Sequence, residues 1–213
     1  MPKRIQELSA KSGVVYIVED DEAVRDSLHW LLENNGFKVS SHENAERFLM
    51  ALANADTVTA ACALLDVRLP GMSGIELQAK LAEKGLHLPV AFVTGHGEVK
   101  MAVQALKHGA HDFIQKPFKE DSVCELVKKM LARASLDQRK NLEAKAAKSK
   151  LQTLTKREKE VLECIVSGKS NRQVGENLSI SLKTVEAHRA NIMDKLGVNR
   201  ATALLTLAMT HKQ

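Results

Sequence analysis

Short apolar runs alternate with helix-like patterns from Gly13 to about Ser135. The runs are rich in Val, Ile, Leu and Ala, which is typical of strands that are buried on both faces of a sheet. We predict five strands, at 14–18, from 37, at 61–65, at 89–93 and at 111–115.

Amphipathic helical patterns separate these strands. Asn34-Asn35-Gly36 is a strong stop signal for the first helix. The later helices are expected over 45–52, around 75–81, over 99–106 and over 121–133. Because strands that alternate with helices form parallel sheets, the five βα units predict an α/β fold: a doubly wound five-stranded parallel sheet with helices on both faces.

The second part of the chain, 153–211, carries four short helical patterns and no strand pattern. Thr155 and Glu158 form a Thr-x-x-Glu capping box, and Ser170 and Ser181 are expected to cap the next two helices. The fourth pattern covers 201–209. Two short helices joined by a tight turn predict an all-α, four-helix helix-turn-helix domain.

The stretch between the two parts is rich in Ala and Lys and lacks Gly and Pro, so it predicts a semi-rigid helical linker. Leu136, Leu142 and Leu151 are too sparse for a coiled-coil seam, and the linker is not expected to be the main dimer contact. We expect a first domain over 13–134, a linker over 135–150 and a second domain over 151–213.

Charge is spread unevenly over the 213 residues, whose formal net charge is +5. Residues 1–135 carry 16 basic and 18 acidic side chains, whereas residues 151–213 carry 10 and 6. Any polyanion is therefore expected to bind the second part. The three cysteines have no metal-like spacing, and no secretory signal or transmembrane run is present, so a reduced, cytoplasmic location is expected.

Polar side chains follow the predicted strands at their carboxyl ends: Glu19 and Asp20 after the first, Asp66 after the third, Thr94 after the fourth and Lys116 after the fifth. Ligands of parallel sheets bind at this edge. Alone, Asp66 fits a helix cap as well as a nucleophile or metal ligand. Clustered carboxylates, however, repel one another unless a cation binds among them, and Mg²⁺ favours carboxylate, water and phosphate oxygens.

Residues 13–133 resemble the receiver domain of two-component response regulators, which has a flavodoxin-like fold. The resemblance rests on the acidic group after the first strand, on Asp66 before the loop Arg-Leu-Pro-Gly-Met-Ser-Gly, on Thr94 and on Lys116-Pro117-Phe118. It implies that Asp66 accepts a phosphoryl group from a phosphohistidine of a sensor histidine kinase.

The resemblance also implies a Mg²⁺ site made by Asp20, Asp66 and the backbone carbonyl of Arg68, with Glu19 acting through a metal-bound water. Asp21 is expected to begin the following helix instead of binding metal. Phosphoryl transfer depends mainly on positioning and charge neutralisation.

The resemblance assigns part of that neutralisation to Lys116, after a cis Lys116–Pro117 bond. Thr94 is expected to donate to a phosphate oxygen, and Phe113 to turn inward when Thr94 moves. Thr94 and Phe113 are thus the expected switch residues. Taken by itself, Phe113 is equally a strand residue that faces the core.

Helical spacing divides the segment 181–196 into two sides. Val185, Ile192 and Leu196 are expected to pack inward. Small and polar residues lie on the other side, which suits a helix entering the major groove of DNA. The segments 154–162, 168–172 and 181–197 resemble the LuxR-type DNA-binding domain, although Gly175 stands where Ala is usual. The resemblance implies DNA contacts by Lys183, Thr184, Glu186, Ala187, His188, Arg189, Ala190 and Lys195; packing is an equal alternative for His188.

Together the two resemblances predict a transcriptional response regulator of the FixJ/NarL class, not an enzyme. Its expected partners are a sensor histidine kinase, double-stranded promoter DNA, RNA polymerase and a second copy of the chain after phosphorylation. Activation by receiver dimerisation and activation by release of an inhibited DNA-binding domain both remain open.

Two other functions are compatible with parts of the sequence. A haloacid-dehalogenase-like phosphatase also uses an Asp nucleophile and Mg²⁺, but it needs an acid two residues later, where this chain has Arg68. A DNA-binding protein with a relic receiver would not need Asp20, Asp66, Thr94 and Lys116 together.

Overall fold

The computed structural model describes residues 13–54, 59–95, 103, 106 and 109–198. Two compact units divide the chain, Met1–Gln138 and Arg139–Gln213, and each is described by itself. The expected helix over 99–106 falls largely outside the described residues, and the expected helix over 201–209 falls wholly outside them.

The first unit contains one five-stranded parallel sheet with the strand order β2-β1-β3-β4-β5. Its strands are β1 (Val14–Val18), β2 (Lys38–His42), β3 (Ala61–Asp66), β4 (Val90–Thr94) and β5 (Asp112–Gln115). The three inner strands are mostly buried, whereas the edge strands β2 and β5 are partly exposed and carry more polar residues. The structure confirms the predicted doubly wound sheet.

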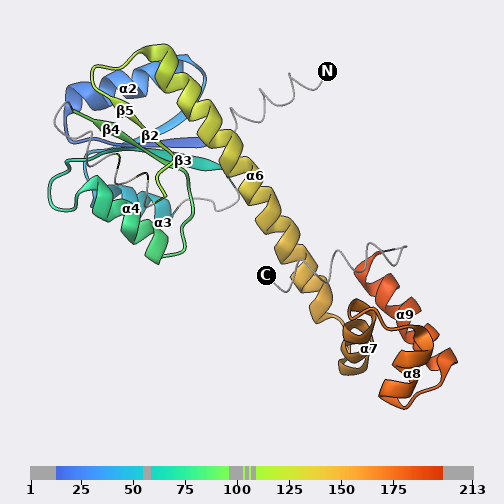
Figure 1. The fold of residues 1–213 in the computed structure, drawn as a ribbon. Helices are drawn as coiled ribbons and strands as arrows, with labels where there is room; N and C mark the ends of the chain where they lie inside the picture. The colour runs from blue at the N-terminus through green and yellow to red at the C-terminus, as the bar shows by residue number, and fades with distance from the viewer. Residues whose placement is uncertain (1–12, 55–58, 96–102, 104–105, 107–108, 199–213) are drawn as a thin grey trace. The chain divides into compact units, whose positions relative to one another are not determined.

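Helices cover both faces of this sheet (Figure 1). They are α2 (Glu22–Asn34), α3 (Ala45–Ala53), α4 (Gly74–Glu83) and α6 (Glu120–Gln152). Side chains alternate between the faces along a strand, so Val15 and Ile17 of β1 join the core under α2 and α6. Tyr16 and Val18 join the second core, under α3 and α4.

Helix α6 is longer than the predicted last helix of the first domain. The sequence predicts a helix over 121–133 and a helical linker over 135–150, and α6 runs through both without a break. Its first half is anchored by buried residues such as Val127, Met130 and Leu131. From 139 to 150 nearly every residue is exposed.

The second unit contains α7 (Lys156–Val166), α8 (Asn171–Leu178) and α9 (Leu182–Leu196) after the end of α6. Thr155 and Ser170 begin α7 and α8 with capping boxes, and Ser181 caps α9, as predicted. The inward residues of α9 are Val185, Ile192 and Leu196, and they share one core with α7 and α8.

Gly175 of α8 lies where the following turn approaches most closely. A Cβ atom at this position would lie 2.8 Å from the carbonyl oxygen of Ile180, whose amide donates to the Gly175 carbonyl over 3.0 Å. Glycine in a helix costs about 1 kcal/mol relative to alanine. Here the missing side chain lets the turn between α8 and α9 pack directly against α8.

Candidate functional site

Three carboxylates meet in the first unit, beside the carboxyl ends of the strands of the sheet. Asp66 is the last residue of β3, and Glu19 and Asp20 directly follow the neighbouring strand β1. Because Val18 pairs with Leu65, the next residues of the two strands are brought side by side. One oxygen from each carboxylate lies within 4.8 Å of the others, with Glu19 and Asp66 buried and Asp20 exposed.

Lys116 joins this group from β5, two strands away from β3. Its Nζ donates to Asp66 Oδ2 over 2.8 Å and to Glu19 Oε1 over 2.9 Å, and it lies 2.8 Å from Glu19 Oε2. The Lys116–Pro117 peptide bond is cis, as the resemblance implies. The backbone N–H of Lys116 donates to the carbonyl of Thr94 over 2.8 Å, which ties the lysine to the end of β4.

Burial and the surrounding charges shift the pKa values of Glu19 and Lys116. Burial, together with the neighbouring Asp66 carboxylate, raises the pKa of Glu19 to about 7, even though Lys116 acts in the opposite direction. Burial by itself lowers the pKa of Lys116, but its contacts with Asp66 and Glu19 outweigh that effect and raise it. Lys116 therefore stays an ammonium ion at neutral pH.

The main chain around Asp66 is held tightly. The N–H of Arg68 donates to Asp66 Oδ1 over 3.0 Å, and the N–H of Gly74 donates to the Val67 carbonyl over 3.1 Å. A Cβ at Gly74 would lie 2.0 Å from the Asp66 carbonyl oxygen, so only glycine permits this approach without a shift of the backbone. Ser73 then begins α4 with a capping box. The sequence includes Gly74 in the loop that carries the receiver resemblance, but sequence reasoning missed its structural role.

The two expected switch residues lie on adjacent strands. Thr94 is fully buried at the end of β4, and its hydroxyl donates to the Gly95 carbonyl over 3.2 Å. Phe113 of β5 pairs with Phe92 of β4 and is partly buried against the core under α3 and α4.

The donor set fits a hard divalent cation. Carboxylate oxygens from Glu19, Asp20 and Asp66 converge, and Mg²⁺ is bound in proteins through one or two carboxylates together with water and phosphate. When all are ionised, these three carboxylates and the Lys116 ammonium sum to a charge of −2, which a divalent cation would balance. Sulfur ligands, which select softer metals, are not part of this cluster.

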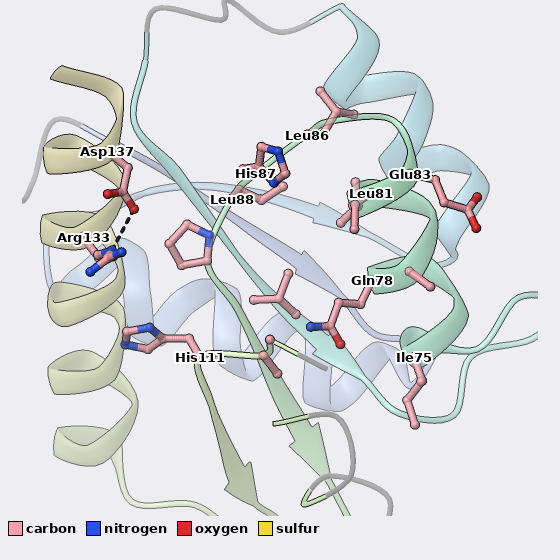
Figure 2. A pocket seen from close by; sticks show the side chains of 16 residues that line it. Ile75, Gln78, Leu81, Glu83, Leu86, His87, Leu88, His111, Arg133 and Asp137 are labelled. Carbon is pink, nitrogen blue, oxygen red and sulfur yellow. Dashed lines mark hydrogen bonds and ion pairs between the residues drawn. The ribbon is translucent and has the colours of Figure 1, made fainter. Parts of the chain in front are cut away.

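A cavity of about 840 Å³ lies between α4, the segments that lead into β4 and β5, and α6. Figure 2 shows its lining, including the Arg133–Asp137 ion pair of α6. Pro89 and His111 line it, and each directly precedes a strand, β4 and β5 respectively, so the cavity lies near the amino ends of these strands. The carboxylate cluster is thus separate from this cavity.

In the second unit, α9 presents the side predicted to face DNA. Of the eight expected contact residues, Lys183, Glu186, Ala187, Ala190 and Lys195 are exposed, and Thr184, His188 and Arg189 are partly buried. The Thr184 hydroxyl is hydrogen-bonded to that of Ser181 over 2.8 Å. The exposed alanines allow close approach, and the polar residues beside them can reach base edges or phosphates.

Lys195 has a structural partner that sequence reasoning did not find. Its Nζ lies 2.9 and 2.7 Å from the two oxygens of Glu158, a buried carboxylate that also closes the capping box of α7. The bond with Lys195, helped by the Thr155 N–H, lowers the pKa of Glu158 to about 2. Among the eight expected DNA contacts, Lys195 is therefore the one whose charge is already engaged.

Comparison with known families matches both units. Residues 15–128 match the response regulator receiver domain, and residues 152–208 match the family of bacterial regulatory proteins named after LuxR. Taken together, the two matches cover most of the chain.

Relatives match this chain along nearly its full length, and so along both of its parts. The transcriptional regulatory protein FixJ of Rhizobium meliloti is 40% identical over 92% of this chain and 94% of its own, and that of Azorhizobium caulinodans is 39% identical over 92% and 91%. Among solved structures, the response regulator StyR is 35% identical, with a TM-score of 0.81 over 93% of this chain and 98% of its own. Full-length FixJ from B. japonicum is also 35% identical, with a TM-score of 0.57 over 95% and 98%.

Proposed function

The chain belongs to the response regulators that join a receiver domain to a LuxR-type DNA-binding domain, and on this premise we propose that Asp66 is its phosphoryl acceptor. The chain is accordingly a transcriptional regulator of the FixJ/NarL type. The observation that carries the proposal is the Lys116 ammonium held 2.8 Å from a buried Asp66 beside two further carboxylates.

The proposed reaction moves one phosphoryl group. A carboxylate oxygen of Asp66 attacks the phosphorus of a phosphohistidine on a sensor histidine kinase, so an O–P bond forms while the P–N bond breaks. The electron pair of the broken bond returns to the histidine nitrogen. Lys116 stabilises the negative charge on the transferring oxygens, because its ammonium already lies against Asp66.

The metal ligands that we propose are Asp20, Asp66 and the backbone carbonyl of Arg68, with Glu19 acting through a bound water. Bound Mg²⁺ would supply further charge neutralisation for the phosphoryl oxygens. Both carboxylate oxygens of Glu19 lie within 2.9 Å of the Lys116 Nζ, whereas Asp66 contacts it through Oδ2, and this supports an indirect role for Glu19.

We propose that Thr94 and Phe113 report the phosphorylation state. The Thr94 hydroxyl, now donating to Gly95, would turn to a phosphoryl oxygen, and Phe113 would fill the space left beside β4. Such a change alters the surface around β5 and biases a two-state equilibrium of the domain.

The output that we propose is binding of promoter DNA by α9. Glu186, Ala187 and Ala190 would face base edges, with Lys183, Thr184, His188 and Arg189 contacting phosphates or the rim of the interface. Phosphorylation would favour a homodimer that binds two half-sites and contacts RNA polymerase. With these partners, we propose a cytoplasmic location. No described helix is long and apolar enough to span a membrane.

We propose this signalling role over a multiple-turnover phosphatase. A phosphatase of the haloacid-dehalogenase type needs an acid two residues after the nucleophile, and Arg68 occupies that position. The relic-receiver alternative is disfavoured because Lys116, Asp66 and Glu19 keep an intact ion-pair network.

The first test is phosphorylation by a small-molecule phosphodonor such as acetyl phosphate with Mg²⁺, followed by intact-protein mass spectrometry. The wild-type chain is expected to gain one acid- and hydroxylamine-labile phosphoryl group, and Asp66→Asn to gain none. Asp26→Asn is a matched control, because Asp26 is an exposed aspartate of α2. Equal uptake by Asp66→Asn and the wild type would refute the assignment.

A further inference from the structure

The turn between β1 and α2 carries four consecutive acidic residues, 19–22, and its conformation decides where two of the proposed metal ligands point. Asp21 caps α2 by accepting from the N–H groups of Ala23 and Val24. The N–H of Glu19 donates to the His42 carbonyl of β2 over 3.1 Å. These bonds fix the two ends of the turn but leave the carbonyl groups between them to other donors.

Arg25 of α2 supplies those donors. Its Nη1 donates to the carbonyl oxygen of Glu19 over 2.9 Å and to that of Asp20 over 3.3 Å. Both bonds leave from this one nitrogen, whose two N–H groups have fixed directions in the guanidinium plane, whereas a lysine ammonium carries no such planar pair of donors. Both residues of the turn that belong to the carboxylate cluster are therefore held through their main chain by one side chain.

The position of Arg25 is not explained by helix stability. It lies in the first turn and a half of α2, close to the helix N-terminus, where the helix dipole favours acidic residues and disfavours cations. Its side chain is half-buried and bonded back to the turn, instead of lying along the solvent side of the helix. The hydrogen bonds from Arg25 to the Glu19 and Asp20 carbonyls explain why a cationic residue stands near the N-terminus of α2.

We propose that Arg25 is a positioning residue for the metal site. Its guanidinium holds the Glu19–Asp20 main chain so that the Asp20 carboxylate faces Asp66 and the Glu19 carboxylate meets Lys116 before any ligand binds. The inference rests on the proposed Mg²⁺ site, and it extends that site by a residue that contacts neither metal nor phosphoryl group. Groups that orient metal ligands in this way change metal affinity by about 10- to 100-fold when they are removed.

A competing effect has the opposite sign. Arg25 is a cation near a cation site, so its removal would strengthen Mg²⁺ binding if long-range repulsion were its main influence. The two effects separate in a pair of variants: Arg25→Met removes both the charge and the N–H donors, whereas Arg25→Lys keeps the charge but lacks the planar pair of donors. Positioning predicts weaker binding in both variants, and repulsion predicts tighter binding in Arg25→Met with no change in Arg25→Lys.

The experiment measures Mn²⁺ binding to the full chain by the EPR signal of the free aqua ion, with Mg²⁺ as competitor. We expect Arg25→Met to raise the Mg²⁺ Kd about 10-fold and Arg25→Lys to fall between it and the wild type. Arg133→Met is the matched control, since Arg133 is an exposed arginine of α6 at the other edge of the sheet. Its Kd is expected to stay within twofold of wild type.

Thermal melts in EDTA accompany the titration, so that each variant is compared at a temperature where it is folded. A folded Arg25→Met with a Kd within twofold of wild type, or with tighter binding, would overturn the positioning role. A wild-type chain that binds no Mn²⁺, or an Asp20→Asn variant that binds it like wild type, would instead overturn the proposed metal site and this inference with it.

Discussion

The charge of Glu19 contributes strongly to the charge balance of the cluster formed by Glu19, Asp20, Asp66 and Lys116. The carboxylate is 1% exposed, and its oxygens lie against the same ammonium that binds Asp66. Burial disfavours the ionised form of such a group, and the nearby Asp66 carboxylate adds to this. Without a divalent cation, folding therefore stabilises the protonated form of Glu19 relative to its ionised form.

This balance predicts a pH dependence of stability in the absence of metal. The pKa of Glu19 rises from its ordinary value of 4.5 to about 7 on folding, so between these values the folded chain binds more protons than the unfolded chain. The free energy of unfolding is then expected to fall as pH rises through that window. Urea denaturation in EDTA measures it, and Glu19→Gln should flatten the slope.

Glu83→Gln serves as the control, because Glu83 is an exposed carboxylate at the end of α4. Its pH profile should follow that of the wild type. If the Glu19→Gln profile ran parallel to wild type as well, Glu19 would not be the group that titrates between pH 4.5 and 7.

At this scale, the sequence indicates which residues meet but not how they bond. Strand ends place Asp20, Asp66 and Lys116 at one edge, because parallel strands open there. The hydrogen bonds from Arg25 to the turn depend on atomic positions that periodicity does not encode. The same holds for the Asp66 carbonyl oxygen, which would lie 2.0 Å from a Cβ at Gly74. An arginine after an acidic run and a glycine opening a helix are the sequence signals for these contacts.

At the level of the helices, an ion pair between Lys195 and Glu158 links α9 to α7. Lys195 reaches the buried Glu158, which also accepts from the Thr155 N–H at the start of α7. Lys195→Met leaves that carboxylate without its cation, and we expect a loss of about 2 kcal/mol of stability in the second unit, given that hydrogen bonds to charged groups contribute about 1.5–3 kcal/mol.

Amide hydrogen exchange of α7 and α9 measures this loss locally. The control is Lys159→Met, which removes an exposed lysine from α7. Unchanged protection in Lys195→Met would show that the pair contributes nothing to the fold. It would also restore Lys195 as a free phosphate contact.

Lys183 at the start of α9 makes a separate prediction about DNA. The side chain is exposed beside the proposed base-contacting residues, so a phosphate contact is expected from it. Lys183→Gln should weaken binding to all DNA sequences and reduce the slope of log affinity against log salt by about 1. Fluorescence anisotropy at several salt concentrations measures the slope, and Lys159→Gln should leave it unchanged.

The elements themselves follow from the sequence with few exceptions. Apolar runs predict β1, β3 and β4 because these strands are buried on both faces, and Ser or Thr caps mark the starts of α7, α8 and α9. Helix α6 is the main difference in bounds, since it joins the helix expected over 121–133 and the helical linker expected over 135–150 into one element. Ala and Lys favour helix without burial, so composition alone cannot set the end of such an element.

At the scale of the whole molecule, the account requires two states of the receiver that differ in their effect on DNA binding. A phosphoryl group on Asp66 would change the charge beside Lys116 and Thr94, whereas α9, the proposed DNA-contacting helix, belongs to the other unit. Coupling between two sites usually changes affinity about 5- to 150-fold. Either receiver dimerisation or release of the DNA-binding domain would produce such a change.

The most direct test measures the DNA affinity of the full chain with and without beryllofluoride and Mg²⁺, on a site selected in vitro from random duplexes. We expect an affinity change of about 10-fold or more for the wild type, within the usual range of coupling, and none for Asp66→Asn. Equal affinity of the two wild-type states would contradict the claim that Asp66 controls α9.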